Sequence, residues 1–331
     1  HRQDLNPKVY KLIRYSLLIG AILCSAYNSF SQDAILLLKD NSSSYFNPAL
    51  TAYADYTKVG LVYRNHLQAV GNGFVTYGAS FDKYLENINS GIGITIMRDQ
   101  PGSKAYNYNN ALLSYSYRIR VGENQTVRAG LLGNFYYSVK DPSKLTFPDE
   151  MDVDGNHIPN NDYERTKAIG IDIGTGILYD NKWLTVGAAL YHLGNKEELH
   201  YHIRKIKLNA HAEVRIPLFS KNTYSNPQTK MQSFLKETYI APNMFYLQQG
   251  STKLTSIGVN LHTKNVRAGI ASRQDIKFNS MVVSMRIGFA ASFLELDYII
   301  DVGKFGDNLK GLSSTSHEIG IIFRFGDDNN Y

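Results

Sequence analysis

Residues 205–216 alternate between apolar and polar side chains without interruption. Successive side chains of a strand point to opposite faces, so one face here is apolar and the other carries both signs of charge. The apolar set is Ile206, Leu208, Ala210, Ala212, Val214 and Ile216. A strand that separates an apolar environment from a polar one over its whole length is typical of the wall of a membrane β-barrel.

The same alternation recurs along most of the chain and predicts about fourteen strands, an even number as in bacterial outer-membrane barrels. They cover residues 56–69, 74–83, 91–98, 107–120, 125–140, 169–179, 184–190, 205–216, 240–249, 253–262, 265–273, 279–290, 292–301 and 315–325. A soluble β-sandwich also alternates, but its strands would be shorter and its polar face would look to open water. We therefore predict an all-β fold, a transmembrane antiparallel β-barrel of the outer-membrane type.

The connections between these strands differ in length in a regular way. Outer-membrane barrels have short periplasmic turns and longer external loops. With both barrel ends in the periplasm, the external connections would be residues 99–105, 141–164, 194–204 and 302–314, and the periplasmic ones are mostly tight, as at 121–124 and 180–181. Residues 217–236 form a long connection where a short periplasmic one is expected. They are either a periplasmic insertion or a sign that the strand count is wrong by one.

The first residues have the features of a secretory signal. Basic Lys8, Lys11 and Arg14 precede the apolar run 17–26, which is shorter than the about 20 residues that span a bilayer. We predict cleavage near Ser31 or Gln32 and export to the bacterial outer membrane. Cys24 is less suited to a lipoprotein site because Leu23 stands where a small residue is wanted. It is also the chain's single cysteine, so the mature chain could form no disulfide.

This reading divides the chain into a signal peptide with upstream residues (1–31), a periplasmic segment (32–55), the barrel (56–326) and a C-terminal tail (327–331). Without residues 1–31 the formal charge falls from +6 to +3, with 31 basic against 28 acidic groups. No basic stripe with interleaved aromatic residues appears, so we do not expect nucleic-acid binding.

The predicted inner face carries both signs of charge in similar number. Its members are Arg64, Arg118, Arg128, Asp172, Lys207, Glu213, Arg215, Arg286, Glu295, Asp297, Glu318 and Arg324. This balance predicts ion pairs across the lumen more than a pore selective for one sign of ion.

Few residues suggest chemistry. Glu150, Asp152 and Asp154 precede Gly155 with the spacing of half a calcium loop, but the twelfth position is Asn161 and a solvated external loop is the simpler reading. His200 and His202 could share a zinc ion, yet no third ligand is placed by spacing. Glycines 91–93 and 170–176 lack the strand-turn-helix context of phosphate loops and fit the lumen face of strands. We expect no enzymatic activity and no cofactor.

Three short motifs resemble one family. They are Phe46-Asn47-Pro48-Ala49, then Val62-Tyr63-Arg64 with Gln68, and Ser314 to Ile321, which contains His317 and Glu318. With these motifs in this order, the chain from about residue 33 to 326 is similar to the PorP/SprF family of outer-membrane proteins of the type IX secretion system. One departure is Leu296-Asp297-Tyr298-Ile299, where the family usually shows a Gly-Tyr-Ser-Tyr-Asp-like run.

The resemblance implies a non-enzymatic barrel that works with the secretion or gliding machinery and helps export or anchor a large adhesin-like surface protein. Its implied partners are that protein, type IX secretion components and outer-membrane lipid. An alternative is a barrel like the fatty-acid transporters, which also have fourteen strands and an Asn-Pro-Ala motif, or a passive porin. The charged inner face counts against an apolar transport cavity. Asn47 and Pro48 are expected to fix the N-terminal segment, with the asparagine side chain capping a turn.

Overall fold

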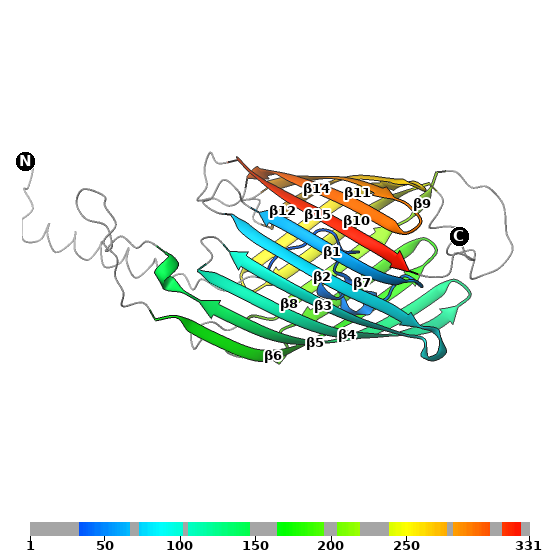
Figure 1. Ribbon diagram of the computed structural model, residues 1–331. Coiled ribbons are helices and arrows are strands. Elements are labelled where there is room, and N and C mark those ends of the chain that lie inside the picture. Colours follow the sequence, from blue (N-terminus) through cyan, green and yellow to red (C-terminus); the bar gives the residue numbers. More distant parts are fainter. Residues whose placement is uncertain are drawn as a thin grey trace, which may run out of the picture.

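The computed structural model describes residues 33–66, 73–101, 105–145, 164–194, 204–218, 238–276, 281–304 and 313–325. They form one closed antiparallel sheet in which most strands pair with their neighbours in sequence (Figure 1). The strands are β1 (Thr57–His66), β2 (Phe74–Leu85), β3 (Ser90–Pro101), β4 (Tyr106–Gly122), β5 (Gln125–Lys140), β6 (Thr166–Asn181), β7 (Leu184–Tyr191), β8 (Lys207–Val214), β9 (Ile216–Pro217), β10 (Tyr239–Gln249), β11 (Thr252–His262), β12 (Val266–Asp275), β13 (Met281–Ala290), β14 (Leu294–Lys304) and β15 (Ser313–Phe325).

Two pairings give the barrel its strand number. β1 pairs with β15 from Thr57–Phe325 to Asn65–His317, which closes the sheet and leaves no free edge along that seam. β8 and the two-residue β9 both pair with β10, so they form a single interrupted wall strand. The register with β10 is the same on both sides of Arg215, since Glu213 pairs with Asn243 and Ile216 with Ile240. The prediction of a fourteen-stranded outer-membrane type barrel is confirmed.

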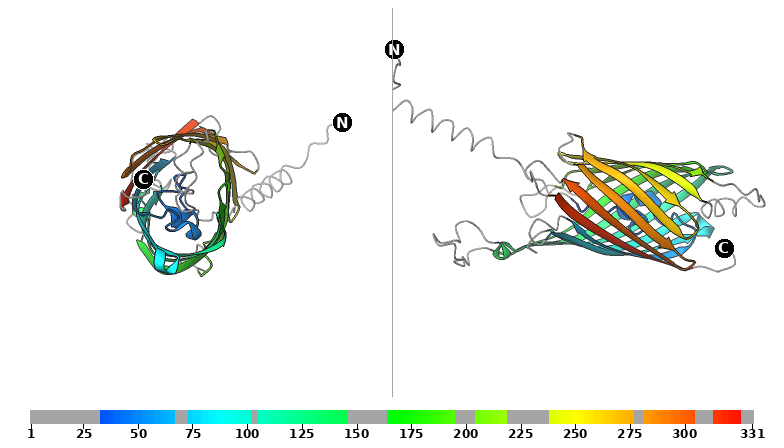
Figure 2. Two further views of the ribbon diagram at one scale, coloured as in Figure 1. Left: turned by 90° about the vertical axis from the view of Figure 1, so that its right-hand side faces the viewer. Right: turned by 90° about the horizontal axis from the view of Figure 1, so that it is seen from above.

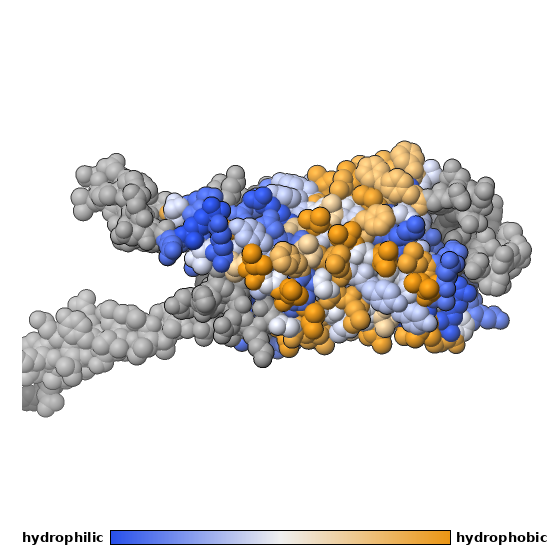
Figure 3. Space-filling model, turned by 60° about the horizontal axis from the view of Figure 1, so that its bottom comes forward, coloured by the Kyte–Doolittle hydropathy of each residue, from blue (hydrophilic) through white to orange (hydrophobic). Residues whose placement is uncertain are grey.

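The outer surface is apolar because the side chains of each strand alternate between lipid and lumen. On β4, Leu113 is 63% exposed and the preceding Leu112 only 3%. Figure 3 shows apolar residues gathered over the middle of the barrel wall and polar residues toward its two ends. Among the described helices, none is long and apolar enough to cross a membrane.

The two ends of the barrel differ in their connections. At one end, which we call the long-loop end, residues 141–165 join β5 to β6 and residues 192–206 join β7 to β8. At the other, the short-turn end, β4–β5 and β6–β7 are joined by two residues each, and β1 begins and β15 ends. The connection 218–238 also leaves from the short-turn end, and its residues 219–237 lie outside the described part of the chain.

Residues 33–55 lie inside the barrel, contrary to the prediction that they form a periplasmic segment (Figure 2). This luminal segment starts with Asp33 at the long-loop end and contains two short helices, α2 (Ser43–Phe46) and η1 (Pro48–Leu50), before β1 begins at the short-turn end. Two further single turns, η2 (Glu86–Ile88) and η3 (Pro142–Lys144), lie outside the lumen in connections. The luminal segment lies inside the barrel because its polar side chains find their hydrogen-bond partners on the inner wall.

Among the described residues, the inward charges pair along the wall and with the luminal segment, and none pairs across the lumen as predicted from the sequence. Arg64 on β1 binds Glu318 on the neighbouring strand β15 at 2.7 Å and Asp301 on β14, one strand further along, at 2.8 Å. Other wall charges reach the segment instead, as Glu213 does with Lys39 at 2.6 Å. Since the segment occupies the space between opposite walls, their charges cannot meet.

Candidate functional site: the luminal segment and its seat

Asn47 holds the middle of the luminal segment with both atoms of its side-chain amide. Its Oδ1 accepts a hydrogen bond from the N–H of Ala49 at 2.9 Å and caps η1, as predicted from the sequence. Its Nδ2 donates to the carbonyls of Ile177 at 3.2 Å and Ala188 at 3.4 Å, and lies 3.2 Å from Nε2 of His211. The motif thus fixes the turn and also ties it to β6, β7 and β8.

Two glycines make room for this amide. A Cβ atom at Gly176 would overlap Oδ1 of Asn47, and one at Gly187 would lie 2.8 Å from Nδ2 of Asn47. Ile177 and Ala188 are directly opposed in the β6–β7 ladder, and the glycines flank this pair diagonally. The asparagine therefore lies in a glycine-flanked seat on the inner wall.

Asn41 occupies a second seat of the same design. Its Nδ2 donates to the carbonyls of Leu61 at 2.9 Å and Ile321 at 3.1 Å, which are opposed in the β1–β15 ladder. Here too glycines flank the pair, and a Cβ atom at Gly60 or Gly320 would lie 2.6–2.7 Å from atoms of Asn41. The sequence analysis missed Asn41, because Asn41-Ser42-Ser43-Ser44 has the composition of an ordinary polar turn.

Glu318 anchors the first part of the luminal segment. Its carboxylate accepts hydrogen bonds from the N–H groups of Leu37 at 3.0 Å and Leu38 at 2.7 Å, and pairs with Arg64. The carboxylate of Glu318 is fully buried and has lost its contacts with water, and these donors replace them. Arg64 and Glu318, which belong to two of the three sequence motifs, therefore act together. His317 faces outward on β15, where its Nδ1 lies 2.6 Å from the hydroxyl of Tyr298.

Arg128 anchors the last part of the luminal segment near the short-turn end. Its guanidinium donates to the carbonyls of Ala52 at 3.1 Å and Tyr53 at 3.0 Å. In the described part of the chain no carboxylate forms a salt bridge with it, so backbone carbonyls and the Tyr53 ring are its main partners. Next to it on β5, Gly130 lies against Pro48 and Ala49, where a Cβ atom would overlap their backbone.

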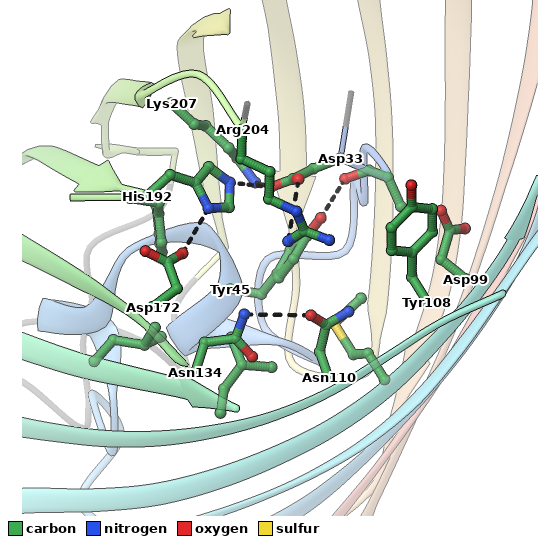
Figure 4. Close-up of a pocket in the computed structure, with 15 residues that line it drawn as sticks. Asp33, Tyr45, Asp99, Tyr108, Asn110, Asn134, Asp172, His192, Arg204 and Lys207 are labelled. Atoms are coloured by element: carbon green, nitrogen blue, oxygen red, sulfur yellow. Dashed lines mark hydrogen bonds and ion pairs between the residues drawn. The ribbon is translucent and has the colours of Figure 1, made fainter. Parts of the chain in front are cut away.

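At the long-loop end, charged side chains gather around the start of the luminal segment (Figure 4). His192 lies between two carboxylates, with Nδ1 2.6 Å from Asp172 and Nε2 2.9 Å from Asp33. Lys207 also binds Asp33, at 3.1 Å. Burial lowers the pKa of His192, but the neighbouring carboxylates outweigh it and raise this pKa to about 9. The ring is therefore charged at neutral pH and holds the segment to β6.

These residues line a cavity of about 40 Å³ between the luminal segment and β3–β8. Its walls combine Asp33, Asp99, Arg204 and Lys207 with the apolar Met97, Leu112 and Leu132. A cavity of this size holds one or two water molecules. It is far smaller than the about 300 Å³ typical of pockets for small organic ligands.

The predicted metal candidates are not placed by the structure. Glu150, Asp152 and Asp154, and also His200 and His202, lie outside the described residues. Within the described residues, no group of three or more His, Cys, Asp or Glu side chains could hold a metal ion. Gly91 and Gly93 lie on β3 against Thr51, and Gly176 lies under Asn47, so these predicted lumen glycines make room for the luminal segment.

Comparisons with known proteins agree with this architecture. The family model described as "Type IX secretion system membrane protein PorP/SprF" matches residues 35–323. Curated proteins gave no match. Among solved structures, the CymD monoaromatic hydrocarbon channel has 15% identity and a TM-score of 0.51, covering 87% of this chain and 93% of its own. The P. putida toluene transporter TodX has 11% identity and a TM-score of 0.51, covering 87% and 94%. At this identity the likenesses show the fold alone.

Gly130 offers a direct test of the close contact between the inner wall and the luminal segment. In the variant Gly130→Val we expect the luminal segment to be displaced, because the side chain overlaps the Pro48–Ala49 backbone and over-packing costs about 1–3 kcal/mol. Protease digestion of the detergent-purified barrel measures this as new cleavage within residues 33–55. Gly133→Val is the matched control on the same strand, since nothing lies within 4 Å of a Cβ there. Equal protection of the segment in both variants would contradict the seat.

The charged state of His192 predicts a pH dependence. Because its folded-state pKa is raised from 6.5 to about 9, its contribution is fully present below about pH 6.5 and is lost as the pH rises through 9. We expect hydrogen-exchange protection of residues 33–38, corrected for intrinsic exchange, to fall between pH 7 and pH 10. His192→Gln should remove this dependence. A wild-type protein with constant protection would show that the bridge does not hold the segment.

Proposed function

The chain belongs to the PorP/SprF family of type IX secretion system membrane proteins, and on this basis we propose that it holds a large exported protein at the cell surface. In this proposal the barrel is a non-enzymatic subunit of the secretion machinery. It resides in the bacterial outer membrane, in keeping with its fold and family. The exported protein, of adhesin type, is retained by the barrel and does not pass through it.

The occupied lumen is the observation that carries this proposal. The luminal segment is bonded to most of the wall, through Asn41 at the β1–β15 seam, Asn47 at β6–β7 and Arg128 at β5. A folded or extended cargo of any size would have to displace the whole segment and leave buried charges such as Arg128 without partners. Leaving a buried charge without its partner costs about 3–5 kcal/mol. A docking role does not require the luminal segment to leave the lumen.

The two ends of the barrel support a division of roles. The long connections 141–165 and 192–206 lie at the long-loop end, and the connections at the short-turn end are tight except for residues 218–238. By the usual rule for outer-membrane barrels, the long-loop end faces outward. In the proposal, residues 141–164 and 194–204 contact the surface protein. Residues 217–236, at the opposite end, contact periplasmic parts of the secretion machinery.

The alternative of a transporter for small hydrophobic molecules draws on the names of two similar folds, a hydrocarbon channel and a toluene transporter. The cavity at the long-loop end argues against it in this protein. It measures about 40 Å³ and is lined by Asp33, Asp99, Arg204 and Lys207 as well as apolar side chains. A dry, apolar cavity of about 150 Å³ can hold benzene, and this cavity is both smaller and more polar.

Conductance separates the two functions. In planar bilayers we expect the wild-type barrel to give little or no ion current, because the luminal segment fills the lumen. Deletion of residues 33–54 should open a steady conductance. Heat-modifiable mobility on SDS gels checks that the deletion variant is still a folded barrel. A large wild-type current, or uptake of toluene into proteoliposomes, would favour the transporter.

Retention of the surface partner can be tested at the long-loop end. Deleting residues 146–163 should leave the barrel folded, since β5 and β6 remain paired from Gln125–Asn181 to Lys140–Thr166. We expect the exported protein to be released into the medium and to be lost from affinity-purified barrel. Unchanged retention would show that this connection is not part of the docking surface.

A further inference from the structure

The connection between β7 and β8 begins and ends at one carboxylate of the luminal segment. Asp33 lies 2.9 Å from Nε2 of His192, the first residue of the connection 192–206. The same carboxylate pairs with Arg204, near the end of the connection, at 4.0 Å, and with Lys207, the first residue of β8, at 3.1 Å. Figure 4 shows these basic side chains grouped around Asp33. One side chain therefore holds both ends of the connection together.

Asp33 is itself fixed to the end of β10. Its N–H donates to Oε1 of Gln249 at 3.0 Å, and Nε2 of Gln249 donates to its carboxylate at 3.4 Å. Gln249 is the last residue of β10 and is opposed to Lys207 in the β8–β10 ladder. The carboxylate is also largely buried, with 13% of the Asp33 side chain exposed. It therefore has a defined position relative to the two strands.

The first end of the connection has a strained backbone that needs such support. His192 has a φ of 63°, in the left-handed region that side-chain-bearing residues rarely adopt. A conformation of this kind persists where surrounding contacts fix it. Both ring nitrogens are bound here, Nδ1 by Asp172 at 2.6 Å and Nε2 by Asp33. Residues 192–194 and 204–206 of the connection belong to the described part of the chain, so these contacts cover both of its ends.

The second end brings further positive charge to the same place. Arg204 lies over the rings of Tyr108 and Tyr136, at 5.2 Å and 5.1 Å from their centroids. Its guanidinium is thereby held near the charged groups of His192 and Lys207. Three positive charges close together repel one another, and the carboxylate of the luminal segment pairs with all three. Without this carboxylate the two ends of the connection would be driven apart.

The luminal segment does not depend on Asp33 for its own place in the lumen. A few residues further along, the N–H groups of Leu37 and Leu38 donate to Glu318. Asn41 is then bound at the β1–β15 seam. Loss of the Asp33 charge should therefore act on the connection and leave the rest of the segment in place.

We propose that Asp33 is a positioning residue of the docking surface, which it orders by holding the two ends of the connection 192–206 together. This inference rests on the proposed function, in which residues 194–204 contact the exported protein. A loop whose ends are fixed has fewer conformations to lose, so less entropy is lost when the partner binds. Asp33 does not touch the partner in this arrangement, because it acts through the basic side chains at the two ends.

Hydrogen exchange and partner retention, measured on the same variant, test this role. Asp33→Asn keeps the shape of the side chain and removes its charge. We expect exchange at residues 192–194 and 204–207 to become roughly tenfold faster, as for a lost hydrogen bond to a charged group. Exchange at residues 41–50 should stay as in wild type. The exported protein that co-purifies with the barrel should fall roughly three- to tenfold, because binding must then order the connection.

Two further variants serve as controls. Asp55→Asn is matched, because Asp55 is a carboxylate near the other end of the luminal segment and pairs with Arg118 at 2.8 Å. It should change neither the exchange at the ends of the connection nor retention. Asp33→Glu keeps the charge and should restore most of the retained protein. Intact mass and heat-modifiable mobility check that each variant is processed and folded as wild type is.

The outcomes separate this inference from the proposed function. If Asp33→Asn leaves exchange at both ends unchanged, Asp33 does not hold the connection and the inference is wrong. If the ends exchange faster but retention is as in wild type, Asp33 has a structural role only and the proposed function stands. An equal loss of retention in Asp55→Asn would also overturn the positioning role. If wild type retains no exported protein, the proposed function itself fails, and the inference with it.

Discussion

The structure depends on the requirement that every buried charge on the inner wall has a partner. The outer face of the barrel is apolar, so the polar half of each strand must point into the lumen, where water is largely displaced. Arg128 shows the consequence most clearly. It has no carboxylate partner in the described part of the chain, and its Nη1 and Nη2 groups donate to the carbonyls of Ala52 and Tyr53. The wall and the luminal segment are therefore stable as a unit, because each supplies the polar partners that the other lacks.

The two asparagine seats show how an irregular segment is fixed inside a regular sheet. Asn41 and Asn47 each place an amide over an opposed cross-strand pair, and glycines beside that pair allow the approach. The seats lie on different parts of the wall, at the β1–β15 seam and at β6–β7. Held at such separated places, the segment is part of the barrel core. A filled barrel of this kind is suited to present its rim to other proteins, and this is why docking is the proposed function.

At the long-loop end, His192 joins the start of the luminal segment to the wall. Its ring lies between Asp172 of β6, at 2.6 Å, and Asp33 of the segment, at 2.9 Å. The next residue, Leu193, remains beside β6, because its N–H bonds to the carbonyl of Ile173 at 3.2 Å. One side chain therefore connects the luminal segment to the wall at the point where β7 passes into its long connection.

The sequence by itself determined the barrel, its fourteen strands and the side of the wall that each residue faces. Alternation with a period of two recurs in long strands between residues 56 and 325, and it favours a membrane barrel over a soluble β-sandwich because the strands are long and their polar face carries charges of both signs. It also singled out Asn47, Arg64 and Glu318, although it could not show that they share one role. The tertiary structure decided the position of residues 33–55, the pairing of Arg128 with backbone carbonyls and the seat of Asn41. These features depend on contacts between residues as many as 281 positions apart, as from Leu37 to Glu318, and an irregular segment has no periodicity that predicts such contacts.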